Sequence, residues 1–225
     1  TGVRATGTVR YGGRDVARMR SRERAEILAL MTQDSYAPNE LRVLDIVRVG
    51  ALAGAAAGKG SATDRSHDAL GQLGIHDLAA RAYSTLSGGQ RQLVQLARVL
   101  AQNSPVMLFD EPTSALDLHH HLTVMHALHE RALAGHIVLI TMHDLSQALR
   151  WSNRIAVIAE QVRLGAPSEV LTPATIREVY GVETESFLSP SGAPTLGLVR
   201  PERWPDAEAS RTARKTASRP PVLRP

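Results

Sequence analysis

The sequence predicts an α/β fold with a parallel, doubly wound sheet, and two observations support this prediction. Strongly apolar segments of strand length recur in the second half of the chain: PVMLFDEP at 105–112, HIVLITMHD at 136–144 and RIAVIAE at 154–160. Segments with helical spacing separate them, and strands that alternate with helices typically pair in parallel. An earlier apolar run, ILALMTQ at 27–33, fits a further buried strand.

The N-terminal part of the chain predicts a hairpin followed by helices. Residues 8–11 suit a strand, and the Gly-Gly pair after them permits a turn and a return strand. Apolar residues with helical spacing run from Leu41 to Ala53. A second helix is predicted from Asp64 to Leu73, with Gly74 as its C-terminal cap.

Start and stop signals define the later helices. Ser87 can cap the first of them, and Gly181 closes the last, where we expect the folded part to end. The predicted helices span residues 88–102, 119–133, 145–151 and 173–180.

Composition limits the class of protein. Of the 225 residues, 43% are hydrophobic, 21% are charged and none is cysteine, which suits a globular protein without disulfide or thiolate chemistry. No stretch reaches the roughly 18 apolar residues of a membrane span, and no signal peptide is visible. The net charge of +4 suits nucleic acid, but much of the excess lies in residues 209–225, rich in Pro, Arg and Ser. We interpret this segment as a solvated, disordered tail, with contact to anionic lipid or nucleic acid as the alternative.

Residues suited to phosphate chemistry occur at a helix start and at strand ends. In STLSGGQRQ at 84–92, a serine and two glycines begin a helix whose unpaired N–H groups and dipole suit a phosphate, although a capped helix without ligand explains them equally. Asp110 and Glu111 end a strand and face different directions, so one can hold Mg²⁺ through water while the other polarises an attacking water. His143 ends the next strand and can contact a phosphate oxygen or that water. Each of these three residues also has a purely structural interpretation as a cap or a satisfied polar group.

In this order the motifs resemble those of the ATP-binding subunit of ABC transporters, over residues 8–185. LSGGQ at 86–90 is similar to the family signature, VMLFDE at 106–111 to the Walker B strand and SALD at 114–117 to the D-loop. The resemblance implies a P-loop NTPase-type (RecA-like) α/β core with a parallel sheet and an α-helical signature subdomain.

The resemblance also implies a role for each matched residue. Two such domains would pair head to tail with ATP and Mg²⁺ between them. Glu111 would be the general base, and His143, the switch histidine, would position water and phosphate. Asp110 and the Q-loop residue Gln33 would bear on Mg²⁺, and Asp117 would communicate across the dimer. The signature of one protomer would close on the γ-phosphate held by the other, through Ser87, Gly88, Gly89 and Gln90.

These roles imply an ATP-hydrolysing subunit of an importer at the cytoplasmic face of the membrane. Its partners would be a transmembrane permease that docks after Gln33, a second ATP-binding subunit and, indirectly, an extracytoplasmic substrate-binding protein. SALDLHHHL, HDLSQALRWSNRIAVI and GAPSEVLTPATIREVYGVETE resemble importers of iron–siderophore complexes, haem and cobalamin. A non-transport ABC-type ATPase that acts on DNA or ribosomes is the alternative. The short segment between Q-loop and signature and the single ATP-binding domain argue against it, so no nucleic acid partner is expected.

The family's P-loop, GxxxxGK followed by Ser or Thr, does not occur in residues 1–33. AGAAAGKGSA at 53–62 has one residue too few between its glycines, and Lys59 is followed by Gly60, so we interpret it as a loop between helices. We therefore expect an N-terminally truncated chain, with the Walker A strand missing, that binds ATP weakly and leaves apolar sheet surface uncovered. A non-catalytic fragment that only offers its signature to a partner is a further alternative.

The resemblance divides the chain into five segments. They are an N-terminal β remnant ending at the Q-loop, the helical subdomain, the RecA-like core, a C-terminal extension and a basic tail that we expect to be disordered throughout, at residues 1–33, 34–98, 99–160, 161–190 and 191–225. The consecutive histidines at 119–121 do not predict a metal site, because neighbouring helical side chains point about 100° apart.

Overall fold

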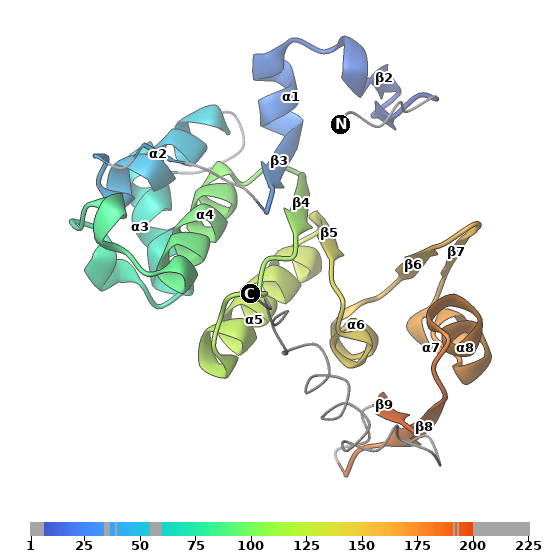
Figure 1. Cartoon of the computed structure of the whole chain (residues 1–225). Coiled ribbons are helices and arrows are strands. Elements are labelled where there is room, and N and C mark those ends of the chain that lie inside the picture. The colour runs from blue at the N-terminus through green and yellow to red at the C-terminus, as the bar shows by residue number, and fades with distance from the viewer. Residues whose placement is uncertain are drawn as a thin grey trace, which may run out of the picture. The chain divides into compact units, whose positions relative to one another are not determined.

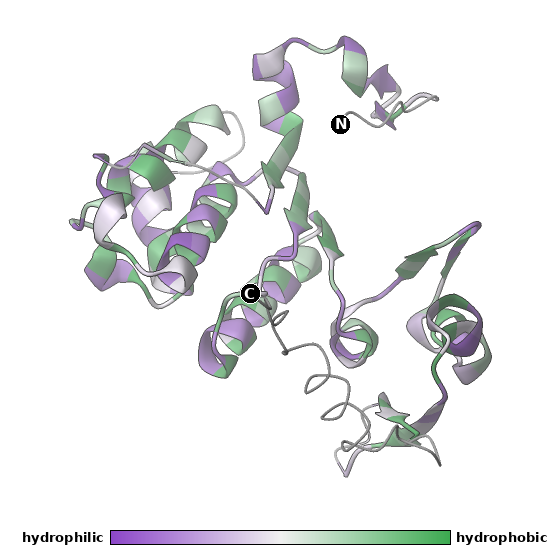
Figure 2. Cartoon of the chain, viewed as in Figure 1, coloured by the Kyte–Doolittle hydropathy of each residue, from purple (hydrophilic) through white to green (hydrophobic). Residues whose placement is uncertain are grey.

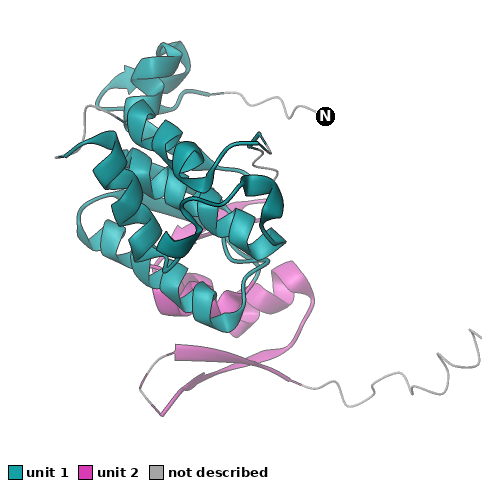
Figure 3. Cartoon of the chain, turned by 90° about the vertical axis from the view of Figure 1, so that its left-hand side faces the viewer, with its two compact units in different colours: residues 1–143 teal, residues 144–225 magenta. Residues whose placement is uncertain are grey.

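The computed structural model describes residues 7–33, 37–38, 40–54, 60–190, 192 and 194–199, and Figure 1 shows its elements. The chain divides into two compact units, unit 1 at residues 1–143 and unit 2 at residues 144–225 (Figure 3). The predicted loop around Lys59 and the basic tail at 209–225 lie outside the described residues. In the described part of the chain, no helix has the length and apolar character needed to cross a membrane.

Unit 1 contains a three-stranded parallel sheet in the order β3–β4–β5. Its strands are β3 (Leu28–Met31), β4 (Val106–Asp110) and β5 (Ile137–Thr141). The central strand β4 buries Met107 and Phe109, and its last residue, Asp110, pairs with Thr141 of β5. Because parallel strands end at the same edge, the polar residues that follow β3, β4 and β5 gather there, which confirms the predicted parallel α/β core.

Three helices of unit 1 pack together as a helical lobe, which we define as α2, α3 and α4 (Figure 1). They span Val43–Ala53, Ala62–Gln72 and Gly88–Gln102, close to the predicted ranges. The short helices η2 (His76–Leu78) and η3 (Tyr83–Thr85) connect α3 to α4. The lobe has a continuous apolar core, because one face of each helix is buried against the others.

Helix caps fix the start of two lobe helices. Ser61 and Asp64 form a reciprocal capping box at the start of α3, and Ser87 and Gln90 form the same arrangement at the start of α4. Hydrogen bonds from Ser61 lower the pKa of the Asp64 carboxyl, because they stabilise its charged form. The predicted cap Ser87 is confirmed, and Gly74 after α3 has the left-handed φ of 67° that glycine tolerates.

The remaining elements of unit 1 flank the lobe and the sheet in sequence. The predicted N-terminal hairpin forms between β1 (Arg10–Tyr11) and β2 (Arg14–Asp15). After it come η1 (Val16–Arg18) and α1 (Ser21–Ile27), which the sequence analysis does not predict. Helix α5 follows β4, as predicted, and spans Leu118–Leu133.

Unit 2 consists of short helices and two antiparallel hairpins. Its elements are α6 (Leu145–Trp151), β6 (Ile155–Ile158), β7 (Val162–Gly165), α7 (Pro167–Val170), α8 (Pro173–Tyr180), β8 (Thr184–Leu188) and β9 (Pro194–Leu198). The predicted helices at 145–151 and 173–180 are confirmed, and Gly181 ends α8 in a left-handed conformation.

Two predictions for unit 2 are wrong. Residues 154–160 were expected to add a strand to the parallel sheet. Among the residues that the structure describes, β6 instead pairs with β7 alone, because the chain turns back after Ile158 into an antiparallel hairpin. The fold also continues past Gly181, where β8 and β9 pair in a second hairpin. Residues 194–198, expected to be disordered, form β9 of that hairpin.

Candidate active site

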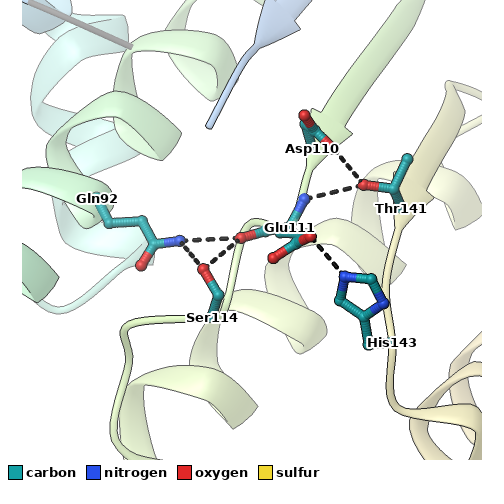
Figure 4. A network of polar contacts seen from close by, with 6 residues as sticks. All are labelled: Gln92, Asp110, Glu111, Ser114, Thr141 and His143. Atoms are coloured by element: carbon teal, nitrogen blue, oxygen red, sulfur yellow. Dashed lines mark hydrogen bonds and ion pairs between the residues drawn. The ribbon is translucent and has the colours of Figure 1, made fainter. Parts of the chain in front are cut away.

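Two predicted site residues, Asp110 and Glu111, lie beside Thr141 at the carboxyl-terminal ends of β4 and β5 (Figure 4). The hydroxyl of Thr141 donates a hydrogen bond of 2.6 Å to Oδ1 of Asp110. The hydroxyl oxygen of Thr141 also accepts the backbone N–H of Glu111 at 3.0 Å. Thr141 therefore fixes the carboxylate of one acidic residue and the backbone of the next.

Glu111 has an unusual backbone conformation that separates the two carboxylates. Its φ is 46°, in the left-handed region that residues other than glycine rarely adopt. Figure 4 shows the carboxylates of Asp110 and Glu111 pointing in different directions. The predicted divergence of the two carboxylates is thus present. It occurs where the backbone turns at Glu111, directly after β4 ends.

The Glu111 carboxylate contacts the imidazole of His143. Nε2 of His143 lies 2.6 Å from Oε1 of Glu111, and because an ionised carboxylate only accepts, the imidazole N–H donates. The Glu111 side chain is 25% exposed and that of His143 is 87% exposed. A partly shielded carboxylate beside an exposed imidazole is suited to hold a water and to accept its proton.

The start of α4 carries the glycines of the predicted signature. A side chain on Gly88 would meet no atom within 4 Å, so the backbone at Gly88 is open to an approaching group. A Cβ on Gly89 would lie 3.0 Å from the carbonyl oxygen of Ala115, so the residues after β4 approach the helix closely at this point. The first N–H groups of α4 have no acceptor within the helix and suit an anion.

Gln92, two residues after the signature, joins α4 to the segment after β4. Its Nε2 donates to the carbonyl oxygen of Glu111 at 3.0 Å and to Oγ of Ser114 at 3.4 Å. Its Oε1 accepts the N–H of Ala115 at 3.1 Å. Gln92 lies within STLSGGQRQ, but no sequence pattern predicts a role for it, because only the fold brings its partners within reach.

A cavity of about 280 Å³ collects residues from all three regions of the predicted site. Gln33 reaches it from the end of β3, Gly88 and Gln92 from α4, and Asp110 and Glu111 from the end of β4. Of the other predicted signature residues, Ser87 and Gln90 cap α4 through each other. Gln33, the start of α4 and the end of β4 therefore line one cavity within unit 1.

Asp117 does not line this cavity but caps helix α5. Its carboxylate accepts the backbone N–H of His120 at 2.8 Å and lies 2.9 Å from Nδ1 of the His120 ring. The backbone hydrogen bond, and after it the ring contact, lower the pKa of Asp117 below its ordinary value. Among the described residues, no three His, Cys, Asp or Glu side chains group as metal ligands.

The donor set of the cavity fits Mg²⁺ but supplies only part of a nucleotide site. The Asp110 carboxylate and the Gln33 amide offer the oxygen ligands that this cation prefers, with water in the remaining positions. The 225 residues contain no glycine-rich loop of the form GxxxxGK followed by Ser or Thr. These residues therefore suit the metal and the γ-phosphate end of a nucleotide, and they do not include the family's usual cradle for the β- and γ-phosphates.

Comparison with known proteins places this geometry in a family context. A family model described as "ABC transporter" matches residues 2–114. The chain is 36% identical over 200 residues to the hemin import ATP-binding protein HmuV of Bordetella avium, covering 84% of this chain and 77% of that protein. It is 38% identical over 191 residues to HmuV of Myxococcus xanthus, covering 80% of this chain and 72% of that protein.

Two solved structures share the fold. The dimeric bacterial ABC transporter cassette MJ0796 superposes with a TM-score of 0.58 and 26% identity, covering 65% of this chain and 66% of that one. A dimeric post-hydrolysis state of MJ0796 bound to ADP and Pi gives a TM-score of 0.63 at 24% identity, covering 72% of this chain and 74% of that one. The second likeness supports the fold alone.

Proposed function

The chain belongs to the ABC transporter family and is an ABC-type ATPase, and from this premise we propose that it couples ATP hydrolysis to the import of haem or a similar iron chelate. The curated relatives, which match 80% or more of this chain, are named for hemin import. Their names support haem over siderophore complexes and cobalamin, the other substrates implied by the sequence motifs.

The contact between Glu111 and His143 carries the hydrolytic part of the proposal. In our account the carboxylate of Glu111 accepts a proton from the water that attacks the γ-phosphate, and the His143 imidazole orients that water and the phosphate. The backbone of Glu111 is held on its N–H by Thr141 and on its carbonyl by Gln92, so the carboxylate is oriented before the nucleotide arrives.

Asp110 and Gln33 would hold Mg²⁺, Asp110 in part through water. When bound, the cation neutralises charge on the phosphate oxygens and orients them. The Thr141 hydroxyl already occupies Oδ1 of Asp110 and so fixes which way the carboxylate faces.

A second ATP-binding subunit would complete the site. The open backbone around Gly88 suits the γ-phosphate of a nucleotide held by a partner, with Ser87, Gly89 and Gln90 beside it. Asp117 would contact the partner across the dimer. The dimeric MJ0796 cassette supports this arrangement as a precedent in the family.

The assembly would work at the cytoplasmic face of the membrane, with a transmembrane permease docked near the segment after Gln33. An extracytoplasmic substrate-binding protein would deliver the chelate to the permease. This placement follows from the importer role of the relatives.

A reconstituted transporter tests the proposal. The protein expressed from its complete reading frame is assembled with its permease in liposomes, and ATP turnover is measured with the binding protein loaded with haem, an iron–siderophore complex or cobalamin. We expect haem to stimulate turnover most strongly. Stimulation by DNA or ribosomes, with none by any chelate, would contradict the import role.

A further inference from the structure

We propose that Gln92 is a positioning residue for catalysis, whose amide fixes the backbone of Glu111 and keeps its carboxylate within reach of His143. Gln92 belongs to the signature helix α4, so the position of the signature and the position of the base are linked within one chain. The inference deepens the proposed function and rests on Glu111 acting as the base.

Both ends of the Gln92 amide are used, and this fixes its orientation. Nε2 donates to the carbonyl oxygen of Glu111, while Oε1 accepts the N–H of Ala115. If the amide were turned over, a nitrogen would face the Ala115 N–H and an oxygen would face the Glu111 carbonyl. Only the observed orientation satisfies both partners, so the side chain acts as a two-ended clamp, and Figure 4 shows its Nε2 end at Glu111 and Ser114.

The clamp acts on a residue whose backbone needs support. Glu111 has a φ of 46°, and non-glycine residues keep such a conformation only where their surroundings over-determine it. Thr141 holds the Glu111 N–H, and the carbonyl accepts Nε2 of Gln92 at 3.0 Å and, from Ser114, Oγ at 3.1 Å and the backbone N–H at 3.3 Å. Loss of Gln92 leaves this carbonyl with partners from Ser114 alone, three residues further along the same loop, and removes its link to α4.

The same clamp connects the signature to the D-loop. Ala115 lies close to α4 at two points: its N–H donates to Oε1 of Gln92, and its carbonyl oxygen would be 3.0 Å from a Cβ placed on Gly89. A shift of α4 toward or away from a nucleotide would therefore move Ala115 and the Glu111 carbonyl together. Gln92 also lines the cavity that contains Asp110 and Glu111, so it lies at the site and not only in the core.

Gln102, at the far end of α4, provides a matched control. Its amide also donates to backbone carbonyls, those of Ala25 at 2.7 Å and Leu28 at 3.1 Å, but these lie before and at the start of β3. Gln102 is buried and does not line the cavity of the site. The substitution Gln→Glu removes the amide donor at either position with almost no change in shape.

The experiment compares Gln92→Glu, Gln92→Met and Gln102→Glu in the protein expressed from its complete reading frame and assembled with its permease. ATP turnover is normalised to the folded fraction from circular dichroism. We expect both Gln92 variants to lower kcat about 10- to 100-fold with KM for ATP within about twofold, because Gln92 orients the base without touching the nucleotide. Gln102→Glu should lower the melting temperature and leave kcat per folded molecule unchanged.

Amide hydrogen exchange at Ala115 separates the two ends of the clamp. Gln92→Glu keeps an oxygen for the Ala115 N–H and should leave its exchange slow, whereas Gln92→Met removes the acceptor and should speed it. The inference is overturned if either folded Gln92 variant keeps kcat within twofold of the parent, or if Gln102→Glu loses as much kcat per folded molecule. Glu111→Gln run in parallel distinguishes the proposals: if it retains full turnover, the proposed function fails as well.

Discussion

The helical lobe and the edge strand β5 of unit 1 bury their apolar residues to very different extents. In the lobe, Val47, Leu70 and Leu96 have no exposed surface. Strand β5 leaves Ile137 and Leu139 each 58% exposed, although its neighbour β4 buries Met107 and Phe109 and Figure 2 colours most of β5 as hydrophobic. No strand among the described residues pairs with the outer edge of β5.

We therefore expect the lobe to determine the stability of unit 1 and the carboxyl edge of the sheet to determine turnover. Two helices of the lobe begin with capping boxes and all three pack on one another, so we expect the lobe to contribute a large share of the free energy of folding. The sheet carries the proposed catalytic groups at its carboxyl edge, and its strand β5 leaves apolar side chains exposed. Changes in the lobe should therefore lower stability, and changes at the edge should lower turnover.

The largest expected difference in stability comes from the same substitution made in each region. Leu96→Ala removes a fully buried side chain of the lobe and should lower the free energy of unfolding by about 2–5 kcal/mol. Leu139→Ala on the exposed face of β5 should change it by about 0.5 kcal/mol or less. Urea denaturation measures both, and equal losses would contradict the contrast between lobe and sheet.

The close contact between α2 and α4 gives the next largest effect. A Cβ on Gly50 would lie 2.1 Å from the carbonyl oxygen of Arg98, so Gly50→Ala must push the helices apart and should cost about 1–3 kcal/mol. Gly71 of α3 has no atom within 4 Å of its Cβ position, and Gly71→Ala should instead stabilise by about 0.5–1 kcal/mol. Thermal denaturation measures both, and a Gly50→Ala variant as stable as the parent would contradict the close packing of α2 against α4.

The capping box of α3 predicts a smaller effect that depends on pH. Ser61→Ala removes the oxygen that accepts the Asp64 N–H and should lower stability by about 1 kcal/mol at neutral pH. Because the hydrogen bonds of Ser61 lower the folded-state pKa of Asp64, their contribution is complete above the unfolded pKa and is lost as the pH falls through the folded pKa. The free energies of unfolding of the parent and of Ser61→Ala should thus converge when denaturation is measured at progressively lower pH. A difference that stays constant down to acid pH would argue against the Asp64 contact.

The same kind of pH dependence is expected at the start of α5. The pKa of Asp117 is lowered mainly by the backbone N–H of His120, so its capping contribution is also lost as the pH falls through the folded pKa. Asp117→Asn keeps a capping oxygen without the charge and should reduce the pH dependence with little change in stability at neutral pH. Amide exchange at His120, followed from neutral to acid pH, provides the measurement. If exchange at His120 depends on pH in Asp117→Asn as it does in the parent, Asp117 is not the cause of that dependence.

The sequence could predict those elements whose signals are local. Helix α4 was predicted together with its cap because Ser87, the glycines and the apolar spacing lie within one continuous segment. RIAVIAE was misassigned because an apolar run predicts a strand but not its partner, and β6 pairs with β7 instead of the parallel sheet. Helix α1 escaped prediction because its sequence, SRERAEI, offers almost no apolar face.

The candidate site shows the same limit. Asp110, Glu111 and His143 could be singled out from sequence because they lie at or just after the ends of two apolar strands, in a recognisable order. The left-handed backbone of Glu111 and the clamp from Gln92 depend on how α4 packs against the segment after β4, and no local pattern reports that packing. Sequence therefore gave the identity of the chemical groups, while the fold supplied the contacts that orient them.

The central claim is that Glu111 is the base of an ABC-type ATPase, and Glu111→Gln tests it most directly. In the assembled transporter, ATP turnover is measured for this variant and for Glu130→Gln, the same change at an exposed position of α5. We predict that Glu111→Gln lowers kcat by about 100-fold or more and accumulates a nucleotide-bound dimer, since a general base contributes about 10²–10⁴-fold. Glu130→Gln should turn over normally. Normal turnover in Glu111→Gln, with no trapped dimer, would contradict the claim.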